Sequence, residues 1–176
     1  NAEGALYELN ILGKDRYEVH FSDRIELPNN EPFSIRKMFQ GRSGFLWIAG
    51  EKDQGLVMYG KHFYSRIDKN NGFKGENVLS MFQDKSGKLY IGTYGTGLYR
   101  TWQQQFYNYN NTKELNTPYI FSILTTGEGL YAGILNSGIY YFEGDNYLKY
   151  ALKRKYDNKT GATTLFQTSS KQVLAG

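Results

Sequence analysis

Few side chains in this sequence could perform acid–base or nucleophilic chemistry. The sequence contains no cysteine and only two histidines, His20 and His62. The lack of cysteine excludes disulfides, thiolate metal sites and thiol nucleophiles. The carboxylates expected in loops show no spacing that singles out a general acid and a general base; they are Glu51, Asp53, Asp68, Glu76 and Glu114. We therefore expect a segment that is not an enzyme, with no metal and no cofactor.

The composition favours strands and turns. Of 176 residues, 29 are aromatic (16 Tyr, 11 Phe and 2 Trp) and 20 are Gly. Aromatic residues favour strands, glycine supplies the positive φ of tight turns, and helical periodicity is absent. Lys plus Arg exceeds Asp plus Glu by 21 to 17, an excess too small to indicate a nucleic-acid partner.

A repeat of about 42 residues runs through the sequence. Hydrophobic anchors recur at steps of 43, 41 and 43, and turn glycines recur at steps of 42 and 41. The anchors are Trp47, Tyr90, Tyr131 and Leu174, and the glycines are Gly55, Gly97 and Gly138. We expect Trp47, Tyr90 and Tyr131 to be core aromatics rather than ligand contacts.

Each repeat predicts four short antiparallel strands. In the second repeat they cover residues 77–83, 88–93, 98–102 and 106–109, which we name strands a to d. Four strands in about 40–50 residues are typical of a β-propeller blade. The prediction is an all-β propeller with about four blades' worth of strands.

The predicted blades divide one domain, residues 1–176. Residues 1–32 supply strands c and d of a preceding blade, and residues 163–176 supply strands a and b of a further one. Full blades are expected at 33–72, 73–116 and 117–162. The two ends could close a ring of four, the lower limit for propellers. We favour a segment of a larger propeller, whose open edges would permit self-association.

Residues 82–93 and 97–100 resemble the two-component regulator propeller repeat. The family pattern is an Asp-x-x-Gly turn, a Trp-Ile-Gly-Thr strand and then Gly-Gly-Leu. This sequence has Asp84–Gly87, Tyr90–Thr93 and Gly97-Leu98, while Gly41 replaces the turn Asp in the first copy. The resemblance implies the periplasmic sensor region of a hybrid two-component histidine kinase, which detects oligosaccharides released from a polysaccharide. The kinase, membrane helix and DNA-binding regulator would lie in other parts of the receptor.

Propellers usually bind ligands on the face lined by the b–c and d–a loops. The b–c loops are predicted at 50–54, 93–96 and 134–137, and the d–a loops at 68–76, 110–118 and 153–162. Polar groups there suit sugar hydroxyls, although the same residue types are ordinary in turns. The candidates are Tyr94, Lys52, Asp53, Thr96 and Asn136. Tyr94 is the strongest candidate, because a large aromatic residue at a loop tip is not required to form the turn.

Two other features, His62 and a basic cluster, are not assigned to the binding face. His62 is expected at a c–d turn on the opposite face. A basic cluster is interpreted as a solvated outer strand rather than a nucleic-acid site; it comprises Lys149, Lys153, Arg154 and Lys155. Two alternatives to a glycan sensor stay open: a propeller that binds only proteins, and a propeller lyase or hydrolase. Saturable binding of an oligosaccharide, without turnover, would separate the sensor from both.

Overall fold

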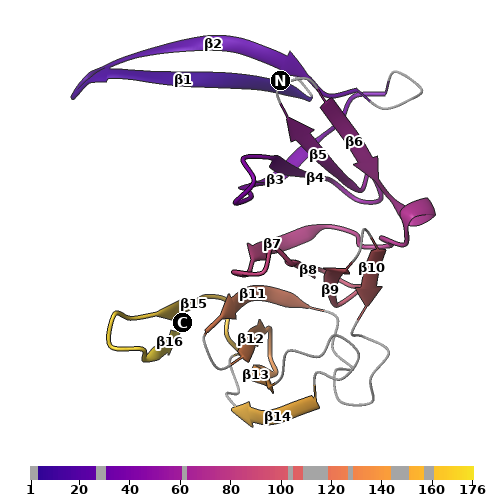
Figure 1. Cartoon of the computed structure of the whole chain (residues 1–176), viewed down its shortest axis with the longest axis vertical. Helices are drawn as coiled ribbons and strands as arrows, with labels where there is room; N and C mark the ends of the chain where they lie inside the picture. Colours follow the sequence, from indigo (N-terminus) through magenta and orange to yellow (C-terminus); the bar gives the residue numbers. More distant parts are fainter. Residues whose placement is uncertain are drawn as a thin grey trace. The chain divides into compact units, whose positions relative to one another are not determined.

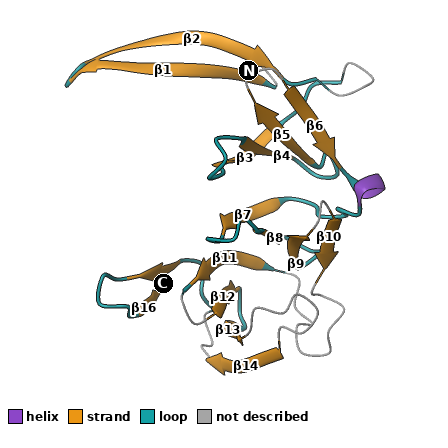
Figure 2. Ribbon diagram, viewed as in Figure 1, coloured by secondary structure: helices purple, strands orange, loops and turns teal. Residues whose placement is uncertain are grey.

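The computed structural model describes residues 4–26, 31–60, 63–102, 105–108, 119–126, 129–143, 151–156 and 161–176. Within these residues the named elements are strands and one short 3-10 helix, η1 (Lys69–Asn71) (Figures 1 and 2). The chain divides into two compact units, Asn1–Ile35 and Arg36–Gly176. No helix in the described part has the length and hydropathy of a membrane span.

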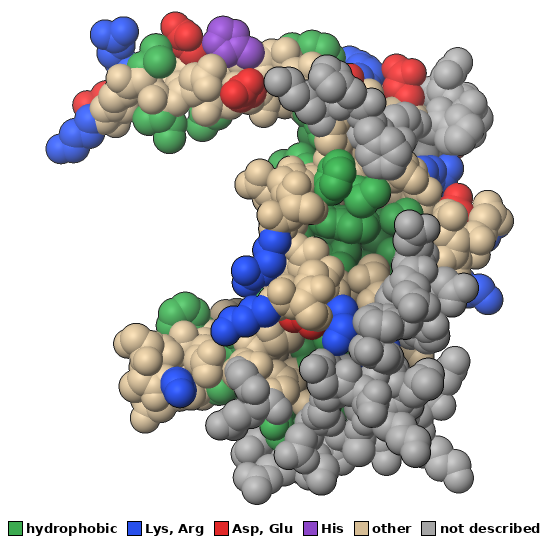
Figure 3. Space-filling view, viewed as in Figure 1, with side chains coloured by type: hydrophobic (Ala, Val, Ile, Leu, Met, Phe, Trp, Pro, Cys, Tyr) green, Lys and Arg blue, Asp and Glu red, His purple; other side chains and the backbone are tan. Residues whose placement is uncertain are grey.

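The first unit contains an antiparallel hairpin of β1 (Ala5–Gly13) and β2 (Arg16–Arg24). Gly4 precedes β1 with a φ of 75°, and its carbonyl accepts a hydrogen bond from the Ile25 amide at 2.8 Å. A Cβ at this position would lie 2.2 Å from the Ile25 carbonyl oxygen, so the close approach requires glycine. Most hairpin side chains are exposed, and hydrophobic and charged groups both appear on its surface in Figure 3.

The second unit contains three four-stranded antiparallel sheets and one two-stranded sheet. Neighbouring strands follow chain order in each sheet: β3 to β6, β7 to β10, β11 to β14, and β15 with β16. The first sheet consists of β3 (Ile35–Gln40), β4 (Leu46–Gly50), β5 (Leu56–Gly60) and β6 (Phe63–Ile67). The second consists of β7 (Val78–Gln83), β8 (Leu89–Thr93), β9 (Leu98–Trp102) and β10 (Gln105–Asn108). The third consists of β11 (Ile120–Thr125), β12 (Gly129–Ile134), β13 (Gly138–Glu143) and β14 (Ala151–Tyr156), and the last of β15 (Leu165–Gln167) and β16 (Val173–Ala175).

These sheets confirm the predicted all-β architecture of four-stranded antiparallel blades. In the second sheet each strand begins and ends within one residue of its predicted position. One predicted loop is wrong: residues 153–156 lie in β14, which pairs with β13, so the third d–a loop cannot begin at 153. Lys153, Arg154 and Lys155 therefore lie in an outer strand, as the interpretation of the basic cluster predicted.

The strands of the second sheet show why the repeat folds this way. Every residue of β8 is buried, as expected for an inner strand with apolar side chains on both faces. Gly92 lies where the next sheet approaches closely. A Cβ there would lie 2.4 Å from Ser80 Oγ and 2.7 Å from the Ile120 carbonyl oxygen. The Gly of the repeat's strand b thus permits close packing between adjacent sheets.

Two hydrophobic clusters join neighbouring sheets. One includes Ala49 and Leu56 of the first sheet together with Met81, Ile91 and Tyr99 of the second. The other joins Tyr90 and Leu98 of the second sheet to the third, through residues such as Ile120, Leu130 and Phe142.

The predicted anchors differ in burial. Tyr90 is 1% exposed and belongs to the core, as predicted. Trp47 is half-buried and packs against the core between the first and second sheets. Tyr131 is also half-buried, and its ring lies 4.7 Å from that of Tyr141 on the adjacent strand. Gly55, Gly97 and Gly138 all have positive φ, as tight turns before strand c require.

Candidate functional site

Each b–c loop connects strands b and c of its own sheet and also contacts the start of the following sheet. Three equivalent residues precede the turn glycines, at steps of 42 and 41: Lys52, Tyr94 and Leu135. Each meets the start of the following sheet, at Asn77, Tyr119 and Gly161 respectively. We call these six residues the loop rim. It is the structural counterpart of the predicted binding face.

Backbone hydrogen bonds hold the loop rim together. The Asn77 amide donates to the Lys52 carbonyl at 3.4 Å, and the Asn77 carbonyl accepts from the Tyr94 amide at 3.0 Å. The Asn77 side-chain oxygen also accepts from the Lys52 amide at 3.3 Å. Farther along, the Leu135 amide donates to the Tyr119 carbonyl at 3.3 Å. Lys52 and Tyr94 are therefore positioned by one shared residue, Asn77.

Tyr94 is the largest exposed side chain of the rim. It is 48% exposed, and its ring lies 4.6 Å from that of Tyr119 with an angle of 48° between the planes. Tyr94 and Tyr119 also form an antiparallel bridge. The pair therefore has a structural role between two sheets, and it leaves part of one aromatic ring open to solvent.

The other predicted residues lie on the b–c loops of three different sheets and differ in exposure. Lys52, Asp53 and Asn136 are exposed, and Lys52 and Asn136 have positive φ values of 50° and 57°. Thr96 is half-buried. Its hydroxyl lies 3.0 Å from that of Thr93, and its carbonyl accepts a hydrogen bond from Asn108 Nδ2 at 2.9 Å. Thr96 therefore fixes the shape of its loop, while the exposed three can reach a ligand.

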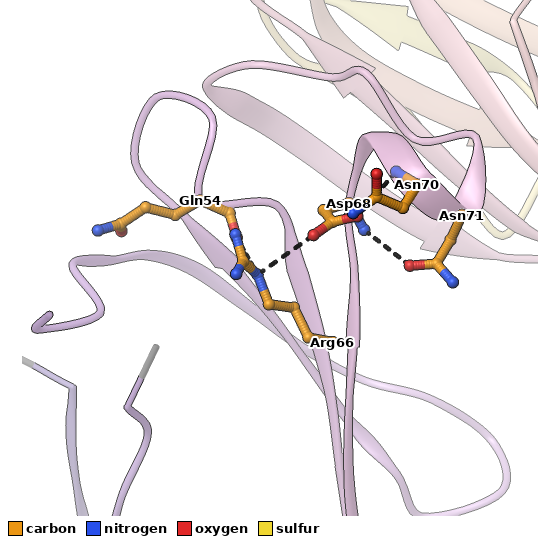
Figure 4. A network of polar contacts seen from close by, with 5 residues as sticks. All are labelled: Gln54, Arg66, Asp68, Asn70 and Asn71. Carbon is orange, nitrogen blue, oxygen red and sulfur yellow. Dashed lines mark hydrogen bonds and ion pairs between the residues drawn. The ribbon is translucent and has the colours of Figure 1, made fainter. Parts of the chain in front are cut away.

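Side chains of the outer strands brace the b–c loops. Arg66 Nε donates to the Gln54 carbonyl at 3.2 Å and lies 3.8 Å from Asp68 Oδ2 (Figure 4). Asn108 makes the equivalent contact to Thr96 in the next sheet, again across twelve positions. In both sheets a side chain of strand d donates a hydrogen bond to the carbonyl of the residue that precedes the turn glycine.

Asp68, one of the candidate carboxylates, has a structural role here. Its Oδ1 accepts from the Asn70 amide at 2.8 Å, and its own amide donates to Asn71 Oδ1 at 3.2 Å (Figure 4). These bonds form a capping box for η1. Glu51, Asp53 and Glu76 are exposed, whereas Glu114, His62 and Lys149 lie outside the described residues.

The arrangement favours recognition by polar and aromatic contacts. No group of three or more His, Asp or Glu suited to a metal ion occurs in the part of the chain that the structure describes. His20 lies in the hairpin of the first unit, 3.4 Å from Glu18.

Sequence reasoning did not single out Asn77 or Tyr119. Each immediately precedes strand a of a sheet, and Asn77 has a φ of 47°. The repeat could have indicated both residues. Lys52, Tyr94 and Leu135 are equivalent positions of successive repeats, and each contacts a residue just before strand a of the following sheet.

Comparison with known proteins identifies the repeat. Residues 72–95 match the model of the two component regulator propeller family. The resemblance predicted from residues 82–93 is therefore confirmed at the level of this repeat. A comparison with curated protein sequences finds no match.

Solved structures share the fold of the chain. The extracellular domain of BT4673 from B. thetaiotaomicron, described as a one component system, aligns with 99% of this chain at a TM-score of 0.70 and 20% identity. A structure of the BT4673 domain described as a hybrid two component system aligns with 100% of it, at 0.65 and 13%. The extracellular domain of BT3049 from the same organism, also described as a hybrid two component system, aligns with 97% at 0.68 and 14%. The chain spans only 23%, 25% and 27% of these structures, about a quarter of their length.

Proposed function

Starting from the two component regulator propeller repeat at residues 72–95, we propose that this chain is a ligand-sensing part of an extracytoplasmic receptor. The fold shared with extracellular domains of such systems supports this proposal. The segment itself would be non-catalytic, and kinase activity would belong to other parts of the receptor. Signalling would then be a population shift between receptor states, driven by tighter ligand binding to one of them.

The proposed ligand is an oligosaccharide released from a polysaccharide, bound at the loop rim. The observation that carries this proposal is Tyr94, which is about half exposed and is braced by Tyr119. A rigid aromatic surface with a few polar groups beside it is the usual composition of a small-molecule site. Lys52 and Asp53 on the b–c loop of the first sheet, and Asn136 on that of the third, supply exposed donors and acceptors.

A binding screen with a Tyr94 series tests this proposal. Isothermal titration against a panel of polysaccharide fragments should find one that binds saturably and is not turned over. Tyr94→Ala should weaken that binding at least about tenfold, equivalent to ~1.4 kcal/mol, whereas Tyr94→Phe should retain most of it.

Phe166→Ala is the matched control, because Phe166 is an exposed aromatic residue outside the b–c loops. If Tyr94→Ala binds the fragment as tightly as the wild type, the loop rim is not the binding site. Turnover of the fragment would instead indicate an enzyme. Capture of a protein with no fragment bound would favour a protein-interaction module.

The proposal extends to self-association through strand edges. Within the described residues β1 pairs only with β2, and β16 pairs only with β15. An unpaired edge can accept a strand from another chain. Pairing of the β16 edge of one copy with the β1 edge of the next would be head-to-tail, so it would continue beyond two copies. Ala175→Pro should abolish such growth, because proline removes a backbone donor from the open edge of β16, whereas the Leu174 amide faces β15.

A further inference from the structure

Asn77 has an uncommon backbone conformation just before β7. Its φ of 47° lies in the left-handed region, which asparagine adopts more readily than most residues. Lys52, its contact in the preceding sheet, also has a positive φ, of 50°. Such conformations persist only where the surrounding contacts hold them, and they cluster at sites with a function. The contact between Asn77 and Lys52 is therefore a candidate for a specific role.

The hydrogen bonds of Asn77 belong to two groups. Its carbonyl accepts from the Tyr94 amide at 3.0 Å, which continues the pairing of β7 with β8. The third sheet repeats this bond, where the Tyr119 carbonyl accepts from the Leu135 amide at 3.3 Å. The other two bonds cross to the first sheet. The Asn77 amide donates to the Lys52 carbonyl at 3.4 Å, and Asn77 Oδ1 accepts from the Lys52 amide at 3.3 Å. Of these bonds, only the last depends on the side chain.

The loop that carries Lys52 is one residue longer than its counterpart in the next sheet. In the first sheet the Gly50 amide donates to the Gly55 carbonyl at 2.9 Å, across four intervening residues. In the second sheet the Thr93 amide donates to the Gly97 carbonyl at 3.1 Å, across three. A longer loop can adopt more conformations, so a further contact is needed to hold one of them. The bond from the Lys52 amide to the side chain before β7 is such a contact.

The equivalent positions before the next two sheets hold their loops by other means. The Tyr119 ring lies 4.6 Å from the ring of Tyr94. Gly161 has no side chain, and a Cβ there would lie 2.4 Å from the Asn136 amide nitrogen. The side chain just before strand a therefore differs at each junction, and only at the first does it bind the backbone of the preceding b–c loop through its own polar atom.

We propose that Asn77 is a positioning residue of the ligand site, whose side chain holds the Lys52 loop so that one ligand contacts both Lys52 and Tyr94. This inference rests on the proposed function. The Lys52 carbonyl and the Tyr94 amide both bind the backbone of Asn77, so they lie within roughly 10 Å of each other. An oligosaccharide of two or more rings is long enough to contact the exposed lysine and the half-exposed aromatic ring together.

Three substitutions separate the side-chain bond from the backbone bonds. Asn77→Gly removes Oδ1 but keeps both backbone groups, and glycine adopts a positive φ without strain. Asn77→Asp keeps an oxygen acceptor in the same place. Asn136→Gly is the control for backbone freedom, because Asn136 also has a positive φ, of 57°, but lies on the loop of the third sheet.

Amide hydrogen exchange of the chain without ligand tests the positioning itself. In Asn77→Gly the Lys52 amide should exchange at least about fivefold faster, because it loses its acceptor. The Tyr94 amide should be unchanged, since its acceptor is a backbone carbonyl. Asn77→Asp should keep the Lys52 amide protected, and Asn136→Gly should leave its exchange as in the wild type. Unchanged exchange of the Lys52 amide in Asn77→Gly would overturn the proposal.

A double-mutant cycle tests the role in binding, with the fragment that binds in the oligosaccharide screen as the probe. Lys52→Ala and Asn77→Gly should each weaken its binding about fivefold. The two together should weaken it little more than either alone, because both remove the same contact. Tyr94→Ala should keep its full effect in the Asn77→Gly background. A general loosening of the fold would reduce both contributions, and full additivity of Lys52→Ala and Asn77→Gly would overturn the proposal.

Failure of this inference is distinguishable from failure of the proposed function. If a fragment binds and depends on Tyr94 but not on Lys52 or Asn77, the sensor proposal stands and the positioning role is overturned. If no fragment in the panel binds saturably, both proposals fail as statements about ligand binding. Recovery of binding in Asn77→Asp, together with its loss in Asn77→Gly, would support the side-chain acceptor as the cause.

Discussion

Asp84 shows how one side chain determines a turn of the repeat. Its Oδ1 accepts hydrogen bonds from the Ser86 amide at 2.9 Å, the Ser86 hydroxyl at 2.7 Å and the Lys88 amide at 2.9 Å. Gly87 completes the turn with a φ of 83°. A charged acceptor with several donors holds the a–b turn of the second sheet in one conformation.

Replacing Asp84 should therefore destabilise the second unit. We expect Asp84→Ala to lower the free energy of unfolding by ~1–3 kcal/mol, because three donors lose a charged acceptor. Chemical denaturation measures this difference. Asp53→Ala, at an exposed loop carboxylate, is the control and should change stability by less than about 0.5 kcal/mol. Equal effects of both substitutions would contradict this account of the turn.

At the scale of the elements, Gln83 links the turns of adjacent sheets. It ends β7, and its Oε1 accepts from the Arg42 amide of the preceding sheet at 2.6 Å. Its Nε2 donates to the Gly87 carbonyl of its own a–b turn at 2.9 Å. The first sheet has Gly41 where the repeat prefers Asp, and Gln83 supplies a side-chain acceptor to that turn from the neighbouring sheet.

Gln83→Ala should loosen the a–b turn of the first sheet. The expected loss of stability is about 1–2 kcal/mol, for two hydrogen bonds. The more specific result is faster hydrogen exchange at the Arg42 amide, which loses its acceptor. Gln167 occupies the equivalent position of β15, and its contact to the Lys171 carbonyl is long, at 3.5 Å. Gln167→Ala should therefore have a smaller effect, and unchanged exchange at Arg42 in Gln83→Ala would refute the link.

At the scale of the whole molecule, burial differs sharply between the two units. All five residues of β8 are buried, whereas all nine residues of β2 are exposed. Backbone hydrogen bonds open more readily where few apolar contacts hold them.

Amide hydrogen exchange should show this difference. We expect the slowest exchange in β8, whose residues are all buried, and much faster exchange in β1 and β2. Uniform protection across both units in dilute protein would contradict this picture.

Much of the fold could be predicted from the sequence because its signals are local. A short, largely apolar run identifies β8 as an inner strand, and Gly87 and Gly97 mark the turns on either side of it by their positive φ. The sequence supported two readings of residues 153–155, a d–a loop and an outer strand, because a basic strand and a basic loop have the same composition; the pairing of β14 with β13 decides for the strand. For the candidate site, the sequence predicted the b–c loops and Tyr94 at a loop tip but not the contact of Tyr94 with Tyr119, and the binding role of these residues stays a prediction.

The sequence by itself determined the repeat, the four-stranded blade and the turns, since each depends on residues within one period of about 42. Only the tertiary structure decided which residues of different repeats meet. Asn77 joins Lys52 to Tyr94 through bonds between neighbouring sheets, and such contacts depend on how sheets pack.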